Sequence, residues 1–237
     1  REIPHLRFIM TSSAPMLPEN WIQFEKRYGI TISQSAGCSE GGLMCSHVGA
    51  DRKIGTIGFP LKYQNIRLLN ETDDEVPRGE PGEIVVSGLQ KSWGYLHPDG
   101  RVEKLPKEHR TGDLGQIDGD GHLTVVGRLK DLIIRGGVNI SPVEIDNILS
   151  QHPCIVDGAA CGIPNQIYGE EVICYVVAQK DSELKAETVI SHCRKSLALF
   201  KMPKEVIFVD QLPKNERGKL DRKALTKFWE RDNLEAK

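Results

Sequence analysis

The sequence predicts an α/β protein with a separate, smaller α+β domain at its C-terminal end. Three patterns carry this prediction. Strand, loop, helix and strand follow one another at the start, short strands with frequent turns fill the middle, and strands alternate with helices after residue 130. At 237 residues the chain can form one large domain or two smaller ones. We place the boundary at Lys130.

The first segments have the order of a parallel α/β unit. A short apolar strand is predicted at 6–10, a helix at 18–27 and a second strand at 30–34. Two strands joined through a helix normally lie parallel in one sheet. The carboxyl ends of both strands are therefore expected at the same edge of that sheet.

Small and polar residues follow both of these strands. Ser13 and Ala14 come after the first, and Ser-Ala-Gly-Cys-Ser-Glu-Gly-Gly at 35–42 is predicted as a loop after the second. Ligands gather at such strand ends in open α/β sheets, and the glycines expose backbone N–H groups. The Ser39 hydroxyl and the Glu40 carboxylate are thus candidate ligand-binding groups. The alternative is an ordinary polar loop.

The middle of the chain predicts a small antiparallel barrel or sheet. Strands are expected at 65–69, 82–88 and 122–126, with turn sequences at 77–82 and 118–121. Each strand is short and each connection is rich in Gly, Pro or Asp. This pattern differs from the strand and helix alternation on either side of it.

Between these strands lies His-Arg-Thr-Gly-Asp at 109–113, where the glycine predicts a tight turn. The Asp113 carboxylate can accept two hydrogen bonds from a vicinal diol such as a ribose. The alternative is a plain turn, because Asp often follows Gly in turns.

The stretch at 127–144 predicts a hairpin followed by a helix. Apolar runs at 132–134 and 138–140 are separated by Gly136 and Gly137, and Ser-Pro at 141–142 is typical of a helix start. Charged residues crowd the beginning of this hairpin: Arg128, Lys130 and Asp131. They either protect an exposed hairpin edge or serve a site formed with other segments.

The remaining residues predict a compact α+β domain with its own core. A basic loop at 212–220 contains Lys219 between Gly218 and an apolar leucine; an ordinary surface loop is the alternative reading. The predicted elements are a helix at 143–150, strands at 155–163 and 172–178, a helix at 187–199, a strand at 206–209 and a helix at 221–229.

Composition limits the partners. Lys plus Arg total 31 and Asp plus Glu total 33, so a net charge of −2 gives no general electrostatic reason to expect nucleic acid as a partner. The six cysteines form no CxxC pair, which favours reduced thiols and a cytoplasmic protein. No apolar run approaches the length of a transmembrane segment. The start without methionine suggests a piece of a longer protein, and no pattern indicates an oligomeric state.

Taken in order, six segments resemble the adenylate-forming superfamily of acyl- and aryl-CoA synthetases, peptide-synthetase adenylation domains and luciferases. They span nearly the whole chain in the order of the family's motifs. The segments are Ser-Ser-Ala-Pro at 12–15, Ala-Gly-Cys-Ser-Glu-Gly-Gly at 36–42, Gly-Glu-Ile-Val-Val-Ser-Gly at 82–88 with Gly94-Tyr95, His-Arg-Thr-Gly-Asp at 109–113, the hinge motif at 127–145, and Asn-Glu-Arg-Gly-Lys-Leu-Asp-Arg at 215–222.

The resemblance implies a role for each matching residue. Ser39 would contact phosphate, Glu40 would hold Mg²⁺, and Asp113 and Arg128 would bind the ribose. Lys219 would be the catalytic lysine and Lys130 the hinge of the small domain. Further ATP- or AMP-binding positions would be Ser13, Ala14, Ala36, Gly37 and Cys38, and CoA-binding positions would be Gly136, Gly137 and Val138.

The implied activity is that of an ATP-dependent carboxylic acid–CoA ligase, with ATP, Mg²⁺ and CoA as cofactors, a small-molecule carboxylate as substrate and a place in metabolism such as that of fatty acids. CoA is favoured because residues 133–145 resemble fatty- and aryl-acid CoA synthetases. The alternatives are an adenylation domain that loads a carrier protein and a non-catalytic, truncated relative that binds a nucleotide or a partner.

Two departures from the family pattern limit this expectation. Ala36 stands where the family has an aromatic residue beside adenine, and the family's Ser/Thr/Gly-rich phosphate loop is absent. Residues 1–129 are therefore expected to be the end of a large AMP-binding domain with a small β-barrel-like part, and residues 130–237 the complete small domain. We expect the isolated chain to be inactive.

Overall fold

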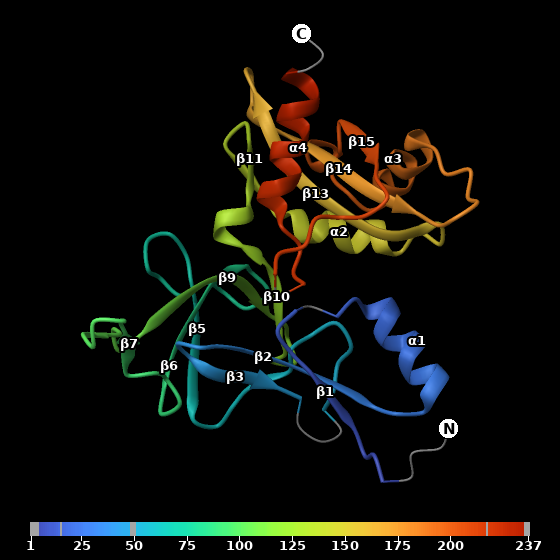
Figure 1. Cartoon of the computed structure of the whole chain (residues 1–237). Coiled ribbons are helices and arrows are strands. Elements are labelled where there is room, and N and C mark those ends of the chain that lie inside the picture. Colours follow the sequence, from blue (N-terminus) through green and yellow to red (C-terminus); the bar gives the residue numbers. More distant parts are fainter. Residues whose placement is uncertain (1–4, 15, 48–50, 217, 235–237) are drawn as a thin grey trace. The chain divides into compact units, whose positions relative to one another are not determined.

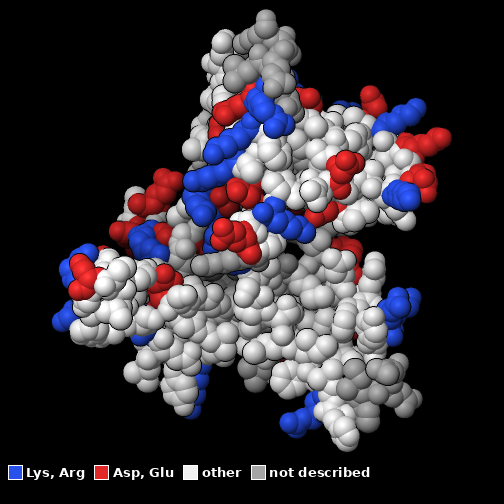
Figure 2. All heavy atoms as spheres, viewed as in Figure 1, with Lys and Arg blue, Asp and Glu red and all other residues white. Residues whose placement is uncertain are grey.

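A computed structural model describes residues 5–14, 16–47, 51–216 and 218–234, with the side chains of 232–234 left out (Figure 1). The chain divides into two compact units, Arg1–Leu129 and Lys130–Lys237, each with its own hydrophobic core. On the face seen in Figure 2, acidic side chains lie next to basic ones, in keeping with the nearly balanced charge. Among the described helices, none combines the length and apolarity needed to span a lipid bilayer.

The first sheet of unit 1 is mixed. Its strands lie in the order β1-β2-β3-β4; β1 and β2 are parallel, and the later pairs are antiparallel. The parallel strand, helix, strand arrangement predicted for the start of the chain is confirmed. The elements are β1 (Ile9–Thr11), α1 (Pro18–Tyr28), β2 (Ile32–Cys38), β3 (Gly42–Ser46) and β4 (Phe59–Pro60).

The loop predicted at 35–42 is wrong in its extent. Residues 35–38 belong to β2, because they pair with β3, and the turn occupies only 39–41. Gly37 sits at a bulge in this pairing, and a Cβ there would lie 2.5 Å from the Gly42 carbonyl oxygen. Only glycine therefore lets the two strands approach closely enough to form the turn.

The second sheet of unit 1 has the order β10-β9-β6-β5, with antiparallel pairing throughout. In the described residues β10 and β5 are its two edges, so the barrel or sheet expected here is an open sheet. The strands are β5 (Gln64–Leu69), β6 (Gly82–Gly88), β9 (His109–Ile117) and β10 (Leu123–Arg128), with a separate hairpin of β7 (Gly94–Leu96) and β8 (Val102–Lys104).

Residues 109–113 were expected in a turn between strands and instead form the first part of β9. The pattern of this segment is too polar to predict a strand. It becomes one because β6 and β10 supply pairing partners on its two sides. Gly112 retains a positive φ of 72° inside the strand, which accounts for the turn signal.

Unit 2 is a sheet with helices on both faces. The order is β12-β11-β14-β13, and β15 also pairs with β14. On β14 the side chains alternate: Val172, Cys174 and Val176 pack with α2 and α3, while Ile173 and Tyr175 pack with α4. The elements are β11 (Ile133–Arg135), β12 (Val138–Ile140), α2 (Pro142–Ser150), β13 (Ile155–Asn165), β14 (Gly169–Ala178), α3 (Ala186–Arg194), β15 (Glu205–Phe208) and α4 (Arg222–Leu234).

The predicted helix at 187–199 ends earlier, at Arg194, and a separate 3-10 turn follows at Leu199–Lys201. The reason is local: Ala198 is extended, with φ −62° and ψ 149°. Leu197 is 7 % exposed and packs in the core of unit 2. Leu197 lies four residues after Cys193 and eight after Val189, so the apolar spacing of the helix continues past its last residue and does not show where the helix ends.

A nearly buried ion pair closes the free edge of β13. Arg222, the first residue of α4, binds the Asp146 carboxylate of α2, and each side chain is 15 % exposed. Arg222 Nη1 also donates to the Ala160 carbonyl at 2.7 Å, and the Ala160 N–H donates to Asp146 Oδ1 at 2.7 Å. The pair thus satisfies both backbone groups of Ala160 and fixes the start of α4.

Arg222→Met is expected to destabilise unit 2 by about 3–5 kcal/mol, because it leaves the Asp146 carboxylate buried without its partner. Urea denaturation followed by circular dichroism measures the change. The control is Lys223→Met, an exposed neighbour on the same helix that should change stability by less than about 0.5 kcal/mol. Equal effects of the two substitutions would contradict the role of the pair.

Candidate functional site

Asp113 and Arg128 are brought together by the second sheet of unit 1. They are register partners in β9 and β10, and Arg128 Nε donates to Asp113 Oδ1 at 2.5 Å. The arginine side chain is 47 % exposed and that of the aspartate 20 %. A carboxylate and a guanidinium side by side at the surface can accept and donate hydrogen bonds to a polar ligand, including the hydroxyl groups of a sugar.

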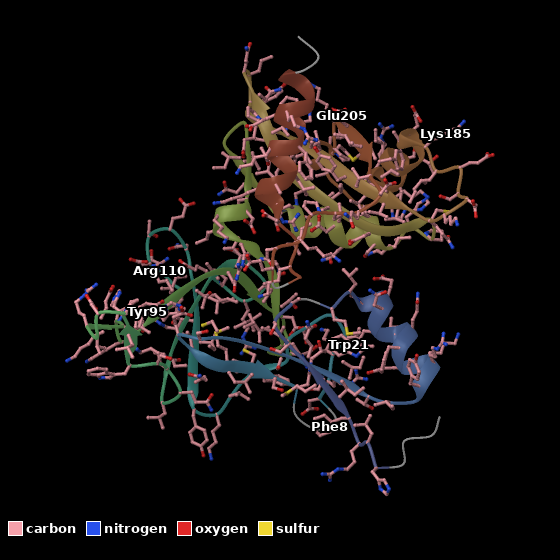
Figure 3. All side chains as sticks on the ribbon, viewed as in Figure 1. Phe8, Trp21, Tyr95, Arg110, Lys185 and Glu205 are labelled. Atoms are coloured by element: carbon pink, nitrogen blue, oxygen red, sulfur yellow. The ribbon has the colours of Figure 1, made fainter. Side chains whose placement is uncertain are left out.

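A buried glutamate that sequence reasoning missed holds this part of β9. Glu83 of β6 is 6 % exposed; Arg110 Nε donates to its Oε2 at 2.7 Å, and the Gly112 N–H donates to its Oε1 at 3.1 Å. Thr111 Oγ1 in turn accepts from the Asp113 N–H at 3.1 Å. Arg110, labelled in Figure 3, therefore stabilises the strand that carries Asp113 through its bond to Glu83. The sequence does contain a sign of this role, because Glu83 is the one charged residue in the mostly apolar strand Gly82–Gly88.

Ser13 and Ala14 lie just beyond β1, as predicted. The side-chain amide of Gln34, a residue only 4 % exposed on β2, donates to the Ala14 carbonyl at 3.1 Å, and Ser35 Oγ donates to the Thr11 carbonyl at 3.4 Å. Ser13 has a positive φ of 75°, which is uncommon for a residue with a Cβ. The backbone at this sheet edge is thus held in a defined, exposed conformation.

Glu40 lies in the turn between β2 and β3. Tyr95 of β7, labelled in Figure 3, donates its hydroxyl to Glu40 Oε1 at 2.8 Å. His109 Nε2 lies 4.0 Å from Glu40 Oε2. The Tyr95 hydrogen bond is the main reason that the pKa of Glu40 falls below its ordinary value. Glu40 is therefore ionised at neutral pH, and it lies next to Ser39, whose carbonyl accepts from Ser92 Oγ at 2.5 Å.

Cys38 and Ala36 occupy the last part of β2. Cys38 Sγ accepts a hydrogen bond from the Gly41 N–H at 3.1 Å, and burial raises the pKa of its thiol. Ala36 pairs with Cys45 of β3. Ala36 and Cys38 therefore lie in the strand that leads directly into the turn with Glu40. All six cysteines of the chain are described, and all are free thiols.

Lys219 lies in a tight turn of unit 2 and is exposed to solvent. The Lys219 N–H donates to Asn215 Oδ1 at 3.0 Å, and the Asn215 N–H donates to the Lys219 carbonyl at 2.8 Å. Gly218 has φ 74°, which closes the turn. The backbone of the predicted loop is therefore shaped by its own hydrogen bonds. Arg217 of this motif and Pro15 of the first motif lie outside the described residues.

The predicted hairpin of unit 2 is confirmed. Gly136 and Gly137 connect β11 to β12 with φ of 58° and 80°, the pair of positive values that a two-residue hairpin turn requires. Both glycines are exposed, and Val138 is 44 % exposed. Lys130 lies before this hairpin in the 3-10 turn Leu129–Asp131, where the first unit ends and the second begins.

Two family descriptions match the chain. "AMP-binding enzyme" matches residues 1–96, and "AMP-binding enzyme C-terminal domain" matches residues 144–219.

Curated proteins and solved structures that resemble this chain point to the same family. An oxalate–CoA ligase of Saccharomyces cerevisiae is 34 % identical over 95 % of this chain and 43 % of its own, and a sulfoacetate–CoA ligase of Cupriavidus necator is 37 % identical over 92 % and 44 %. The crystal structure of ATP-bound MatB from Rhodopseudomonas palustris aligns with a TM-score of 0.85 and 32 % identity, over 95 % of this chain and 48 % of that one. The chain thus spans a little under half the length of these proteins.

Tyr95→Phe is expected to raise the pKa of Glu40 toward its ordinary value, because the hydrogen bond that favours the ionised carboxylate is lost. A lowered pKa stabilises the fold above the ordinary value, and this contribution disappears as the pH falls through the lowered pKa. The substitution should therefore reduce stability at neutral pH and not in acid. Carboxyl ¹³C NMR titration and denaturation at both pH values measure this, with Tyr63→Phe, an exposed tyrosine, as the control. An unchanged Glu40 titration would contradict the assignment.

Proposed function

This chain belongs to the adenylate-forming AMP-binding enzyme superfamily, and we propose that it is part of an ATP-dependent carboxylic acid–CoA ligase. In such an enzyme a carboxylate oxygen attacks the α-phosphorus of ATP and pyrophosphate leaves. The CoA thiol then attacks the acyl carbon, AMP leaves and the thioester remains. The relatives at 34–37 % identity that are named for a CoA ligase activity support CoA as the acceptor.

The observation that supports the proposal most directly is the pairing of Asp113 and Arg128 on neighbouring strands, with 2.5 Å between Arg128 Nε and Asp113 Oδ1. We assign it to the ribose hydroxyls of ATP, with Asp113 accepting and Arg128 donating hydrogen bonds. The buried Glu83 keeps the strand in place, so the pair is preorganised before a nucleotide binds. Ser39 would contact phosphate, and the remaining nucleotide-facing positions would be Ser13, Ala14, Ala36, Gly37 and Cys38.

Glu40 fits the role of a magnesium ligand. Mg²⁺ prefers oxygen ligands and commonly takes one or two carboxylates together with phosphate oxygens and water. The Glu40 carboxylate is ionised, and Tyr95 orients it through one oxygen, which leaves Oε2 directed toward His109. When bound, the ion would neutralise phosphate charge during attack on the α-phosphorus.

Unit 2 would supply the groups that change between the two half-reactions. Attack of a carboxylate on ATP brings two anions together, and the Lys219 ammonium would stabilise the charge that develops at the α-phosphorus. Rotation at Lys130 would then replace Lys219 by the hairpin with Gly136, Gly137 and Val138, beside which CoA would bind. The boundary between the two compact units at Leu129 and Lys130 supports this hinge.

We propose a small-molecule carboxylate as the substrate, and fatty acids are one class of such acids. We also propose a cytoplasmic reaction, because free thiols suit a reducing compartment. Carrier-protein loading and binding of a nucleotide without turnover are the other outcomes that the tests below separate.

In the complete protein, Lys219→Ala is expected to lower carboxylate-dependent pyrophosphate exchange by about 10²–10³-fold or more, because the charge at the α-phosphorus loses its stabilising ammonium. Thioester formation from a supplied acyl-adenylate should stay nearly unchanged. Lys214→Ala, an exposed lysine of the same loop, should leave both rates unaffected. Equal loss of both half-reactions would contradict the role of Lys219. Nucleotide binding without any exchange by the unchanged protein would overturn the ligase proposal.

Lys130→Pro is expected to uncouple the half-reactions, with adenylation retained and thioester formation lost. Proline fixes φ near about −65° and removes the N–H, which traps one of the two conformations that a hinge must visit. Leu129, the residue before it, starts a 3-10 turn, and a proline disfavours helical geometry in the preceding residue, so the substitution acts on that turn as well. Lys130→Ala keeps φ free and is the control. A proportional loss of both rates at an unchanged thermal midpoint would rule out the hinge.

A further inference from the structure

Three metal-ligating side chains of different chemistry meet beside the β2–β3 turn. Cys38 comes from the end of β2, Glu40 from the turn and His109 from the start of β9. Their ligand atoms, one thiol sulfur, one carboxylate oxygen and one imidazole nitrogen, all lie within 4.8 Å of one another. Segments about seventy residues apart in the sequence are thus joined at one point, and all three residues are partly accessible to solvent.

The carboxylate is already oriented for such a site. Tyr95 binds Glu40 Oε1 at 2.8 Å, so Oε2 faces His109 Nε2 at 4.0 Å, which is beyond hydrogen-bond length. A tetrahedral ion with bonds of about 2.0–2.3 Å places its ligands roughly 3.3–3.8 Å apart. Small side-chain adjustments would therefore bring all three atoms onto one ion.

We propose that Cys38, Glu40 and His109 bind a thiophilic divalent cation of the zinc class. Thiolate, imidazole and carboxylate are together the ligands that Zn²⁺ selects, whereas Mg²⁺ takes oxygen ligands. Cys38 binds as the thiolate and releases its proton to solvent. Glu40 is also the magnesium ligand in the proposed function, and on that premise the two ions exclude each other.

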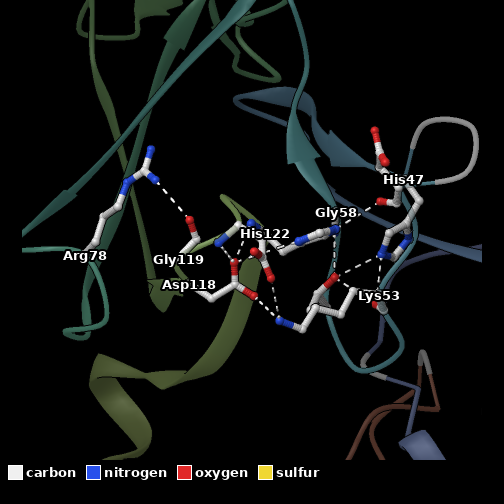
Figure 4. Close-up of polar contacts among 10 residues, drawn as sticks. His47, Lys53, Gly58, Arg78, Asp118, Gly119 and His122 are labelled. Carbon is white, nitrogen blue, oxygen red and sulfur yellow. Dashed lines mark hydrogen bonds and ion pairs between the residues drawn. The ribbon is translucent and has the colours of Figure 1, made fainter.

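A second group of ligands in the same unit differs in a decisive way. Asp118, Asp120 and His122 also come within 4.8 Å of one another, but Lys53 Nζ lies 2.6 Å from Asp118 Oδ2 and 3.4 Å from Asp120 Oδ2 (Figure 4). The lysine ammonium already pairs with both carboxylates. That group contains no thiol, so a sulfur-specific signal distinguishes it from the proposed site.

The test is titration of the 237-residue chain with Co²⁺, followed by displacement with Zn²⁺. Cobalt bound through a thiolate gives a sulfur-to-metal charge-transfer band in the near ultraviolet. Cys38→Ser should abolish the band, and His109→Gln should weaken Co²⁺ binding at least about tenfold. Serine also accepts the Gly41 hydrogen bond, so the turn is kept, and the thermal midpoint without metal verifies folding.

Cys154→Ser is the matched control, because Cys154 is the other partly exposed thiol. It should leave the band unchanged. A band that survives in Cys38→Ser, a band lost in Cys154→Ser, or no band in the unchanged chain would each overturn the proposal. The measurement needs neither ATP nor turnover, so failure of the proposed ligase activity would not affect its result.

Discussion

In each unit a nearly buried carboxylate fixes a functional segment by binding both an arginine and a backbone N–H group. Glu83 does so in unit 1 with Arg110 and Gly112, and Asp146 does so in unit 2 with Arg222 and Ala160. A buried carboxylate without such partners is strongly destabilising, so each arginine is committed to its place once the core forms. The first anchor holds the strand that carries Asp113, and the second holds the segment that follows Lys219.

The elements that the sequence predicts well are those whose signals are local. The strand Gly82–Gly88 follows from an apolar run between glycines, and the β11–β12 hairpin follows from paired glycines between β-branched residues. Strand β9 was missed because its first residues are polar and become a strand through neighbours on both sides. The early end of α3 does not show in the apolar pattern, because Leu197 continues the spacing of Val189 and Cys193 beyond the last helical residue.

The same division holds for the candidate site. Motif resemblance selects Asp113, Arg128 and Glu40, but their pairings arise from strand register and from the β7–β8 hairpin. Tyr95 belongs to a recognised segment, yet only the structure shows its hydroxyl on the Glu40 carboxylate. Sequence spacing also gives no sign that His109 approaches Cys38 and Glu40, because the approach depends on how β9 lies beside the β2–β3 turn.

The anchoring of Lys219 constrains how the proposed reaction can proceed. Asn215 binds both backbone groups of Lys219, and three residues later Arg222 is bound to Asp146 and to the edge of β13. A large displacement of the lysine backbone alone would break these bonds and expose a buried charge. Rotation of the Lys219 side chain keeps these bonds, but it can move the ammonium group only within the reach of one lysine side chain. If the proposed reaction needs a larger change in the lysine's position, movement of unit 2 as a body would keep these bonds intact, in accord with the hinge proposed at Lys130.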